Sequence, residues 1–249
     1  SVTVVYKENS LPQNLNDGVS QTFSTFWSGS PKIFNAVFSQ DYIPRRSGVK
    51  KIYARVFLQN DGDSTNDIKQ KTIGVTNIIT RFPFEEQFDG NSDSGWFSGS
   101  TTFANDWQKG SPNKTHIKSA YSLPNCWITK KDTLADYSDN QNSFLISPIF
   151  DFSSLVADPV LTFYHNFNLE TFADGVVVEY SINGNDFQIL GDPEDTTSHQ
   201  WYNNSSPTQN DSINGPNWTG NSDTYPTHTN GWIFSSVILQ GLAGQGKVQ

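Results

Sequence analysis

NSFLISPIFDFSSLVADPVLTFYHNFNLETFADGVVVEYSINGNDFQILG, residues 142–191, is the stretch that decides the fold. Polar and apolar residues partly alternate in it, which is typical of strands with one buried face. Asn183-Gly184-Asn185 predicts a hairpin turn, because Asn and Gly tolerate the positive φ angles that such a turn requires. The stretch is thus predicted to be a β-framework with strands at residues 144–152, 160–167 and 176–181 and a return at 187–190.

The composition of the whole chain agrees with an all-β protein. The 249 residues are 14% aromatic and only 35% hydrophobic, and helical periodicities are rare. This length allows one large or two modest domains. In the first part, residues 48–58 alternate, a polar turn follows, and residues 68–75 return, which predicts a long hairpin that closes a small β-sandwich. We expect domains at residues 1–78 and 82–249, with residues 76–81 as the linker.

Charge and cysteine content exclude several classes of function. The net charge of −9 argues against nucleic acid or an anionic membrane as a partner, since either would need a basic face. No apolar run has transmembrane length, so we expect no direct membrane insertion. The one cysteine, Cys126, is predicted to be a small packed apolar residue. The chain has no Met, and we expect an internal segment of a longer polypeptide, with its first domain incomplete at the N-terminus and its second at the C-terminus.

Several motifs occur in an order that resembles a known domain family. They are residues 83–89, 95–96, 107, 142–152, 161–163, 174–184 and 239–245. Their order is similar to the MAM-like jelly-roll domain of the cleaved-adhesin, or choice-of-anchor J, type from secreted surface proteins of Bacteroidota. The resemblance covers residues 82–249, except for a long insertion at about 192–230. The hairpin at residues 48–75 resembles the closing strands of Ig-like adhesion modules.

The resemblance implies a fold and a cellular setting. The fold is an Ig-like β-sandwich followed by a larger two-sheet jelly roll. The setting is the outer-membrane cell surface or the medium, reached through the type IX secretion system. Adhesive or accessory roles and bound calcium are common in that family.

Acidic residues of the second domain are candidate ligands for a structural calcium ion. Calcium prefers oxygen ligands from carboxylates, amide side chains and backbone carbonyls. The alternative is that these residues are solvated carboxylates in turns. The candidate metal ligands are Glu86, Asp89, Asp93 and Asp174.

Aromatic residues in and beside the long insertion are candidate ligand-binding residues. Sugars pack on aromatic faces while neighbouring Asp and Asn side chains take the hydroxyl groups, and the same rings also serve protein interfaces. The alternative is that the rings cover the core beneath the loop. The candidates are Trp201, Tyr202, Trp218, Tyr225 and Trp232.

Short Asp-Ser or Asp-Thr motifs resemble the O-glycosylation acceptor pattern of Bacteroidota. They make this chain a candidate glycoprotein. The candidate acceptors are Ser64, Thr133, Thr196 and Ser212.

No catalytic apparatus is evident in the sequence. The four histidines form neither an HExxH motif nor a close pair, and there is no GxSxG motif. We therefore expect no enzyme but an adhesion or display segment of a large surface protein, including those used in gliding. Its partners would be surface glycans, other surface proteins and further domains of the same polypeptide. The alternative is a carbohydrate-binding accessory segment of a secreted protease or glycoside hydrolase.

Overall fold

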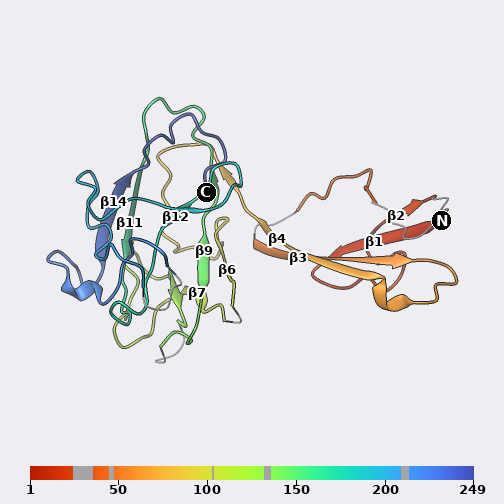
Figure 1. The fold of residues 1–249 in the computed structure, drawn as a ribbon, viewed down its shortest axis with the longest axis horizontal. Coiled ribbons are helices and arrows are strands. Elements are labelled where there is room, and N and C mark those ends of the chain that lie inside the picture. The colour runs from red at the N-terminus through yellow and green to blue at the C-terminus, as the bar shows by residue number, and fades with distance from the viewer. Residues whose placement is uncertain (25–35, 45–47, 103, 132–135, 209–212) are drawn as a thin grey trace. The chain divides into compact units, whose positions relative to one another are not determined.

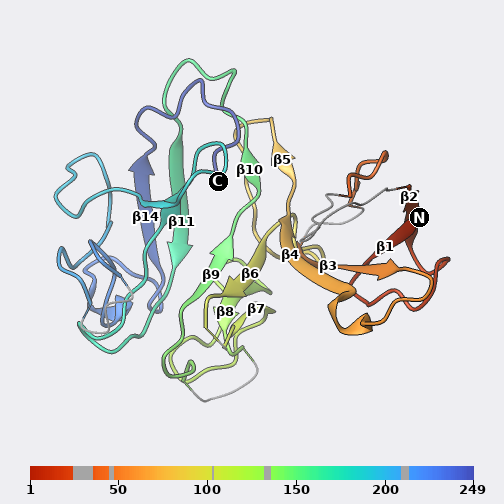
Figure 2. The ribbon, with the colours of Figure 1, turned by 45° about the vertical axis from the view of Figure 1, so that its right-hand side comes forward.

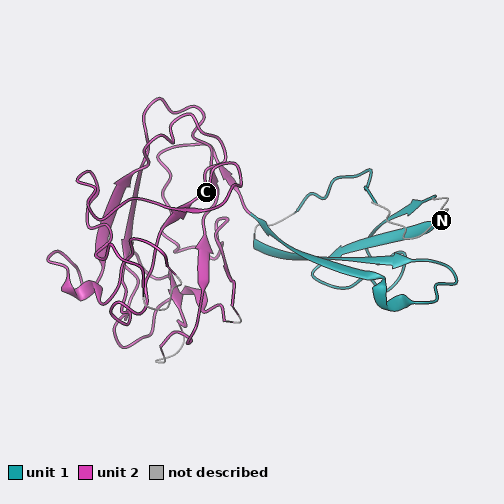
Figure 3. Cartoon of the chain, in the orientation of Figure 1, with its two compact units in different colours: residues 1–75 teal, residues 76–249 magenta. Residues whose placement is uncertain are grey.

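The computed structural model describes residues 1–24, 36–44, 48–102, 104–131, 136–208 and 213–249. These residues form strands and loops, with short 3-10 helices at Ser64–Asn66 and Ser222–Thr224, so the all-β prediction is confirmed. None of the described helices is long and apolar enough to cross a membrane. The chain divides into two compact units, Ser1–Val75 and Thr76–Gln249 (Figure 3).

Unit 1 contains a four-stranded antiparallel sheet in the order β2-β1-β3-β4 (Figure 1). Val4 and Val5 are buried in the middle strand, and the ring of Tyr6 packs edge-on against Phe38 with centroids 4.9 Å apart. The run at residues 33–38, whose sequence also predicts a strand, lies largely outside the described residues. The hairpin predicted at residues 48–75 is present as β3 and β4. The bounds are β1 (Val2–Glu8), β2 (Val19–Phe23), β3 (Gly48–Phe57) and β4 (Ile68–Val75).

Unit 2 consists of short strand pairs joined by long loops. The pairs β6–β9, β7–β8, β11–β14 and β12–β13 are antiparallel, and β5 pairs with β10 in parallel. The β11–β14 pair and the β6–β9 pair run on different sides of this unit (Figures 1 and 2). The bounds are β5 (Ile78–Ile79), β6 (Phe97–Ser100), β7 (Trp107–Gly110), β8 (Cys126–Thr129), β9 (Ser143–Ile146), β10 (Ile149–Phe150), β11 (Val160–His165), β12 (Glu179–Tyr180), β13 (Gln188–Ile189) and β14 (Ile233–Ile238).

The residues expected to form a linker lie within unit 2. Ile78 pairs with Ile149, and Ile79 pairs with Phe150. Two apolar residues between polar neighbours give too weak a strand signal to separate β5 from a connection in the sequence.

The stretch at residues 142–191 does form the framework, but in shorter pieces than expected. The first predicted strand is broken at Ser147-Pro148 into β9 and β10, since proline has no N–H to donate to a ladder. The hairpin turn after β12 has Asn183 at φ 58° and Gly184 at φ 77°, as its sequence predicts.

The main core of unit 2 lies on the inner face of the β11–β14 pair. Along β14 the buried and partly buried residues alternate strictly, and Ile233 and Val237 point inward with 0% and 2% exposure. Leu161 and Phe163 of β11 pack against the same cluster. The other side of this core is covered by the segment that follows β13.

Candidate functional site

The described part of the long segment, residues 192–208 and 213–230, is paired with the framework through its backbone. Trp218 and Val176 exchange two hydrogen bonds of 3.0 and 2.9 Å between their N–H and C=O groups. His199 makes the same exchange with Ser236 of β14, at 2.9 and 3.1 Å. The segment is therefore a further irregular layer of the fold, which its turn-rich sequence conceals.

Three of the aromatic candidates lie in the core. Trp201, Tyr202 and Trp218 are 4%, 4% and 1% exposed. The Trp218 ring centroid lies 5.1 Å from that of Trp201, 4.6 Å from that of Tyr202 and 4.4 Å from that of His165. The Trp201 indole N–H donates to the carbonyl of Leu190 at 3.0 Å. Buried rings present no face to a ligand, so their burial favours the alternative that they cover the core.

The other two aromatic candidates are only partly buried. Tyr225 packs against Phe167 of the same core, and burial raises the pKa of its hydroxyl to about 12. Trp232 packs against the small cluster around Ala120, and its indole N–H donates to the carbonyl of Ser119 at 3.1 Å. Of the five candidates, only Trp232 belongs to the exposed aromatic surface described below.

His165 is a core residue, and its imidazole is uncharged near neutral pH. Its Nε2 lies 2.9 Å from the Ser235 hydroxyl, which in turn donates to the carbonyl of Gln200 at 2.7 Å. Since the Ser235 hydrogen is used in that bond, Nε2 must donate to Ser235 Oγ. Burial lowers the pKa of His165 to about 3. The residue therefore ties β11 through β14 to the long segment as a neutral imidazole.

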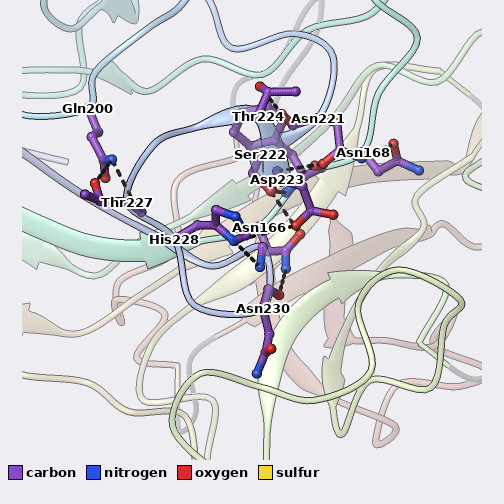
Figure 4. A network of polar contacts seen from close by, with 12 residues as sticks. Asn166, Asn168, Gln200, Asn221, Ser222, Asp223, Thr224, Thr227, His228 and Asn230 are labelled. Atoms are coloured by element: carbon purple, nitrogen blue, oxygen red, sulfur yellow. Dashed lines mark hydrogen bonds and ion pairs between the residues drawn. The ribbon is translucent and has the colours of Figure 1, made fainter.

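A network of polar contacts fixes the end of the long segment against the end of β11 (Figure 4). Ser222 is fully buried, and its hydroxyl lies 3.1 Å from Asn166 Oδ1 and accepts from the N–H of Phe167 at 3.1 Å. The Asn166 amide donates to the carbonyl of Asn230 at 3.2 Å. These bonds satisfy buried polar groups that would otherwise cost stability, and they hold the loop in one conformation.

Ser222, Asp223 and His228 lie in this network without forming a catalytic relay. The Ser222 hydroxyl is bonded to Asn166 and Phe167, as described, so its hydrogen is used within this network. His228 Nδ1 accepts from the N–H of Gly231 at 3.1 Å and lies 3.9 Å from Asp223 Oδ1. A nucleophile needs a base within hydrogen-bond reach, and this arrangement provides none for Ser222.

Cys126 is buried in the cluster of Ala120 and Ile128, and burial raises the pKa of its thiol to about 12. A thiol in that environment is not the thiolate that nucleophilic chemistry requires. The prediction of a small packed residue is confirmed.

The four candidate calcium ligands make separate contacts. Glu86 Oε1 accepts from the N–H of Phe88 at 2.7 Å, and Asp93 lies 3.6 Å from the Lys109 ammonium. Asp174 accepts a hydrogen bond from the Tyr137 hydroxyl. Asp89 is exposed in a loop, where its backbone carbonyl accepts from the side-chain amide of Asn125 at 3.2 Å. Within the described ranges, no three His, Cys, Asp or Glu side chains are grouped so that they could hold a metal ion.

The calcium prediction therefore has no support from these side chains, and chelation tests it directly. An ion that binds only the native state raises the melting temperature, so a calcium-loaded chain should melt lower after addition of EDTA. Equal melting temperatures with calcium and with EDTA would contradict the prediction.

Two of the four candidate glycosylation sites can be placed. Ser64 begins the first 3-10 helix and is exposed, and Thr196 is exposed in the loop after β13. Thr133 and Ser212 lie outside the described residues. An exposed hydroxyl is accessible to a glycosyltransferase, and glycosylation of Ser64 and Thr196 stays a prediction.

An exposed group of aromatic side chains on the outer face of β11–β14 was missed by the sequence reasoning. The ring of Tyr121 stacks on that of Tyr164 with centroids 3.5 Å apart and planes at 11°. Tyr164 also contacts Phe234 of β14 at 5.2 Å between centroids. The ring centroid of His199 lies 6.0 Å from that of Phe234, and the ring centroid of Trp232 lies 6.4 Å from that of Tyr121. We call these five rings the aromatic face.

The signal for this surface is present in the alternation of β11. Leu161 and Phe163 are the inward positions, which leaves Thr162 and Tyr164 outward on a strand without any charged residue. Tyr121 could not be found in this way, because it comes from a loop whose packing onto the sheet has no local signature.

A comparison of the chain with known protein families, curated proteins and solved structures finds no match. Function is therefore inferred from the contacts of this chain.

Proposed function

We propose that this chain is an adhesion or display segment of a larger bacterial protein that is secreted or held at the outer-membrane surface. Its role is to present a fixed loop surface to surface glycans or other surface proteins, without transforming them. The observation that carries the proposal is the backbone pairing of the described part of the long segment, residues 192–208 and 213–230, with Val176 and β14. Preorganised loops lose little conformational entropy on binding, which favours recognition.

Three side chains of the types that catalysis commonly uses are held in packing or hydrogen-bonding contacts in the described part of the chain. His165 is a neutral core residue, Cys126 has a raised pKa, and Ser222 is bonded to the end of β11. These contacts support a structural role for each of them. The buried network instead supplies rigidity, which is what a binding surface needs from the residues beneath it.

A second candidate is a carbohydrate-binding accessory segment of a secreted protease or glycoside hydrolase. It is favoured by the exposed stacking of Tyr121 on Tyr164, since exposed aromatic rings suit sugar recognition. The two candidates share a binding surface and differ in what is attached to it.

Bead adhesion tests the proposed function. Beads coated with the chain should be retained under flow on bacterial cells or on polysaccharide-coated slides, whereas albumin-coated beads should wash off. Heat-denatured chain on the same beads is the matched control, and it should lose retention because the fixed loops are lost. Equal retention of native, denatured and albumin-coated beads on every surface would contradict an adhesive role.

A further inference from the structure

The strands beneath the aromatic face are uncharged. Neither β11 nor β14 contains an Asp, Glu, Lys or Arg residue. The outward positions of the two strands lie opposite one another in pairs, with Tyr164 beside Phe234 and Thr162 beside Ser236. Contiguous exposed apolar patches on a protein surface mark interaction sites, and this surface combines exposed rings with hydroxyl groups.

The rings on this surface are held in place while they stay accessible. Tyr121 and Tyr164 are 46% and 43% exposed although they stack on each other. Trp232 is anchored by its bond to Ser119, so its indole N–H is already satisfied. Tyrosine and tryptophan rings that are fixed in this way offer contact area at little entropic cost.

The charge of the surface selects the ligand class. The chain as a whole carries a net charge of −9, so a polyanion would be repelled, and the two strands provide no Lys or Arg to pair with one. A strongly cationic partner would find no carboxylate on these strands. The complementary ligand is neutral, with apolar faces to lie on rings and hydroxyl groups to bond with Thr162, Ser236 and the tyrosine hydroxyls.

We propose that the aromatic face binds a neutral saccharide chain, with the C–H face of a pyranose ring against Tyr121 and neighbouring hydroxyls at Thr162 and Ser236. This names the ligand class for the binding role proposed above and rests on it. The bound sugar lies across β11 and β14, on the opposite face of these strands from the core that contains Trp218.

Calorimetric titration with oligosaccharides tests the proposal. The probes are neutral cello-, xylo-, manno- and chito-oligosaccharides, with alginate and heparin oligosaccharides as anionic probes. At least one neutral series should bind and no anionic series should. Tyr121→Ala should weaken that binding by about tenfold or more, since truncation of an aromatic anchor commonly has this effect. Tyr121→Phe keeps the ring and should restore most of it.

The matched control is Phe187→Ala, which removes an aromatic side chain of similar exposure, 41%, that does not belong to the aromatic face. It should bind as the unchanged chain does, and the melting temperatures of all three variants should match that of the unchanged chain. The proposal is overturned if no neutral series binds, if only an anionic series binds, or if Tyr121→Ala binds as well as the unchanged chain.

Bead adhesion separates failure of this proposal from failure of the proposed function. If beads adhere to cells and no neutral oligosaccharide competes, the adhesive role stands and the saccharide proposal fails. Beads with the unchanged chain are also tested on protein surfaces that carry no polysaccharide. If they adhere there and Tyr121→Ala abolishes that adhesion, the aromatic face binds protein and the saccharide proposal is again wrong. If neither beads nor sugars bind, both fail.

Discussion

Replacing Trp218 by alanine should destabilise unit 2 by about 3–5 kcal/mol, the range for a large buried aromatic side chain. The indole is 1% exposed and contacts the rings of Phe163, His165, Trp201 and Tyr202. Its removal leaves a cavity between the long segment and the β11–β14 pair. Since whole domains are stable by only about 5–15 kcal/mol, this one change should leave unit 2 marginal.

Urea denaturation followed by tryptophan fluorescence measures the loss. Six of the seven tryptophans lie beyond residue 76, so the signal reports mainly on unit 2. Trp218→Phe should lose less, because a smaller ring still fills part of the space. Phe187→Ala serves as the exposed control and should change stability by less than about 0.5 kcal/mol. A similarly small loss in Trp218→Ala would show that the long segment is not part of the core.

Acid should weaken the protein through His165 well before its carboxyl groups are protonated. Burial lowers the pKa of this imidazole from 6.5 to about 3 in the folded chain. Below pH 6.5 the unfolded chain therefore binds a proton that the native chain does not, and stability falls by about 1.4 kcal/mol per pH unit. Relative to its value above pH 6.5, the free energy of unfolding is lower by about 2 kcal/mol at pH 5, and it continues to fall towards pH 3.

The difference between two pH profiles isolates this effect. His165→Phe keeps an aromatic ring in the core and removes the titrating group. Between pH 7 and pH 5, its free energy of unfolding should therefore fall by about 2 kcal/mol less than that of the unchanged chain. The carboxyl groups titrate in both proteins and cancel in the comparison. His116→Gln, at an exposed position, should keep the slope of the unchanged chain. Parallel profiles for His165→Phe and the unchanged chain would contradict a buried neutral histidine.

Local signals in the sequence were sufficient for much of the framework. The short run Cys126–Thr129, whose sequence predicts a strand, forms β8, and Asn183-Gly184 makes its turn because those two residues tolerate a positive φ. The alternation in residues 48–75 gives the hairpin of β3 and β4. In each case the residues that predict the element are the same residues that form it.

The packing of the long segment could not be predicted from local signals in the sequence. Residues 192–230 are rich in Asn, Ser, Thr and Pro, which favour turns, and no period marks Trp218 as buried. Its burial follows from pairing with Val176, some forty residues earlier in the chain. The same limit applies to Tyr121, whose stacking partner Tyr164 lies on a distant strand. Tertiary packing therefore decided both the core and the candidate binding surface.

Hydrogen exchange at the amide of Trp218 tests most directly whether the long segment is a fixed layer of unit 2. That N–H donates to the carbonyl of Val176 at 2.9 Å beneath a buried indole. We predict exchange as slow as that of the Val237 amide in β14, because both should open only with unit 2 as a whole. Exchange as rapid as at exposed Asn185 would mean that the segment opens independently, and a fixed loop surface would then be ruled out.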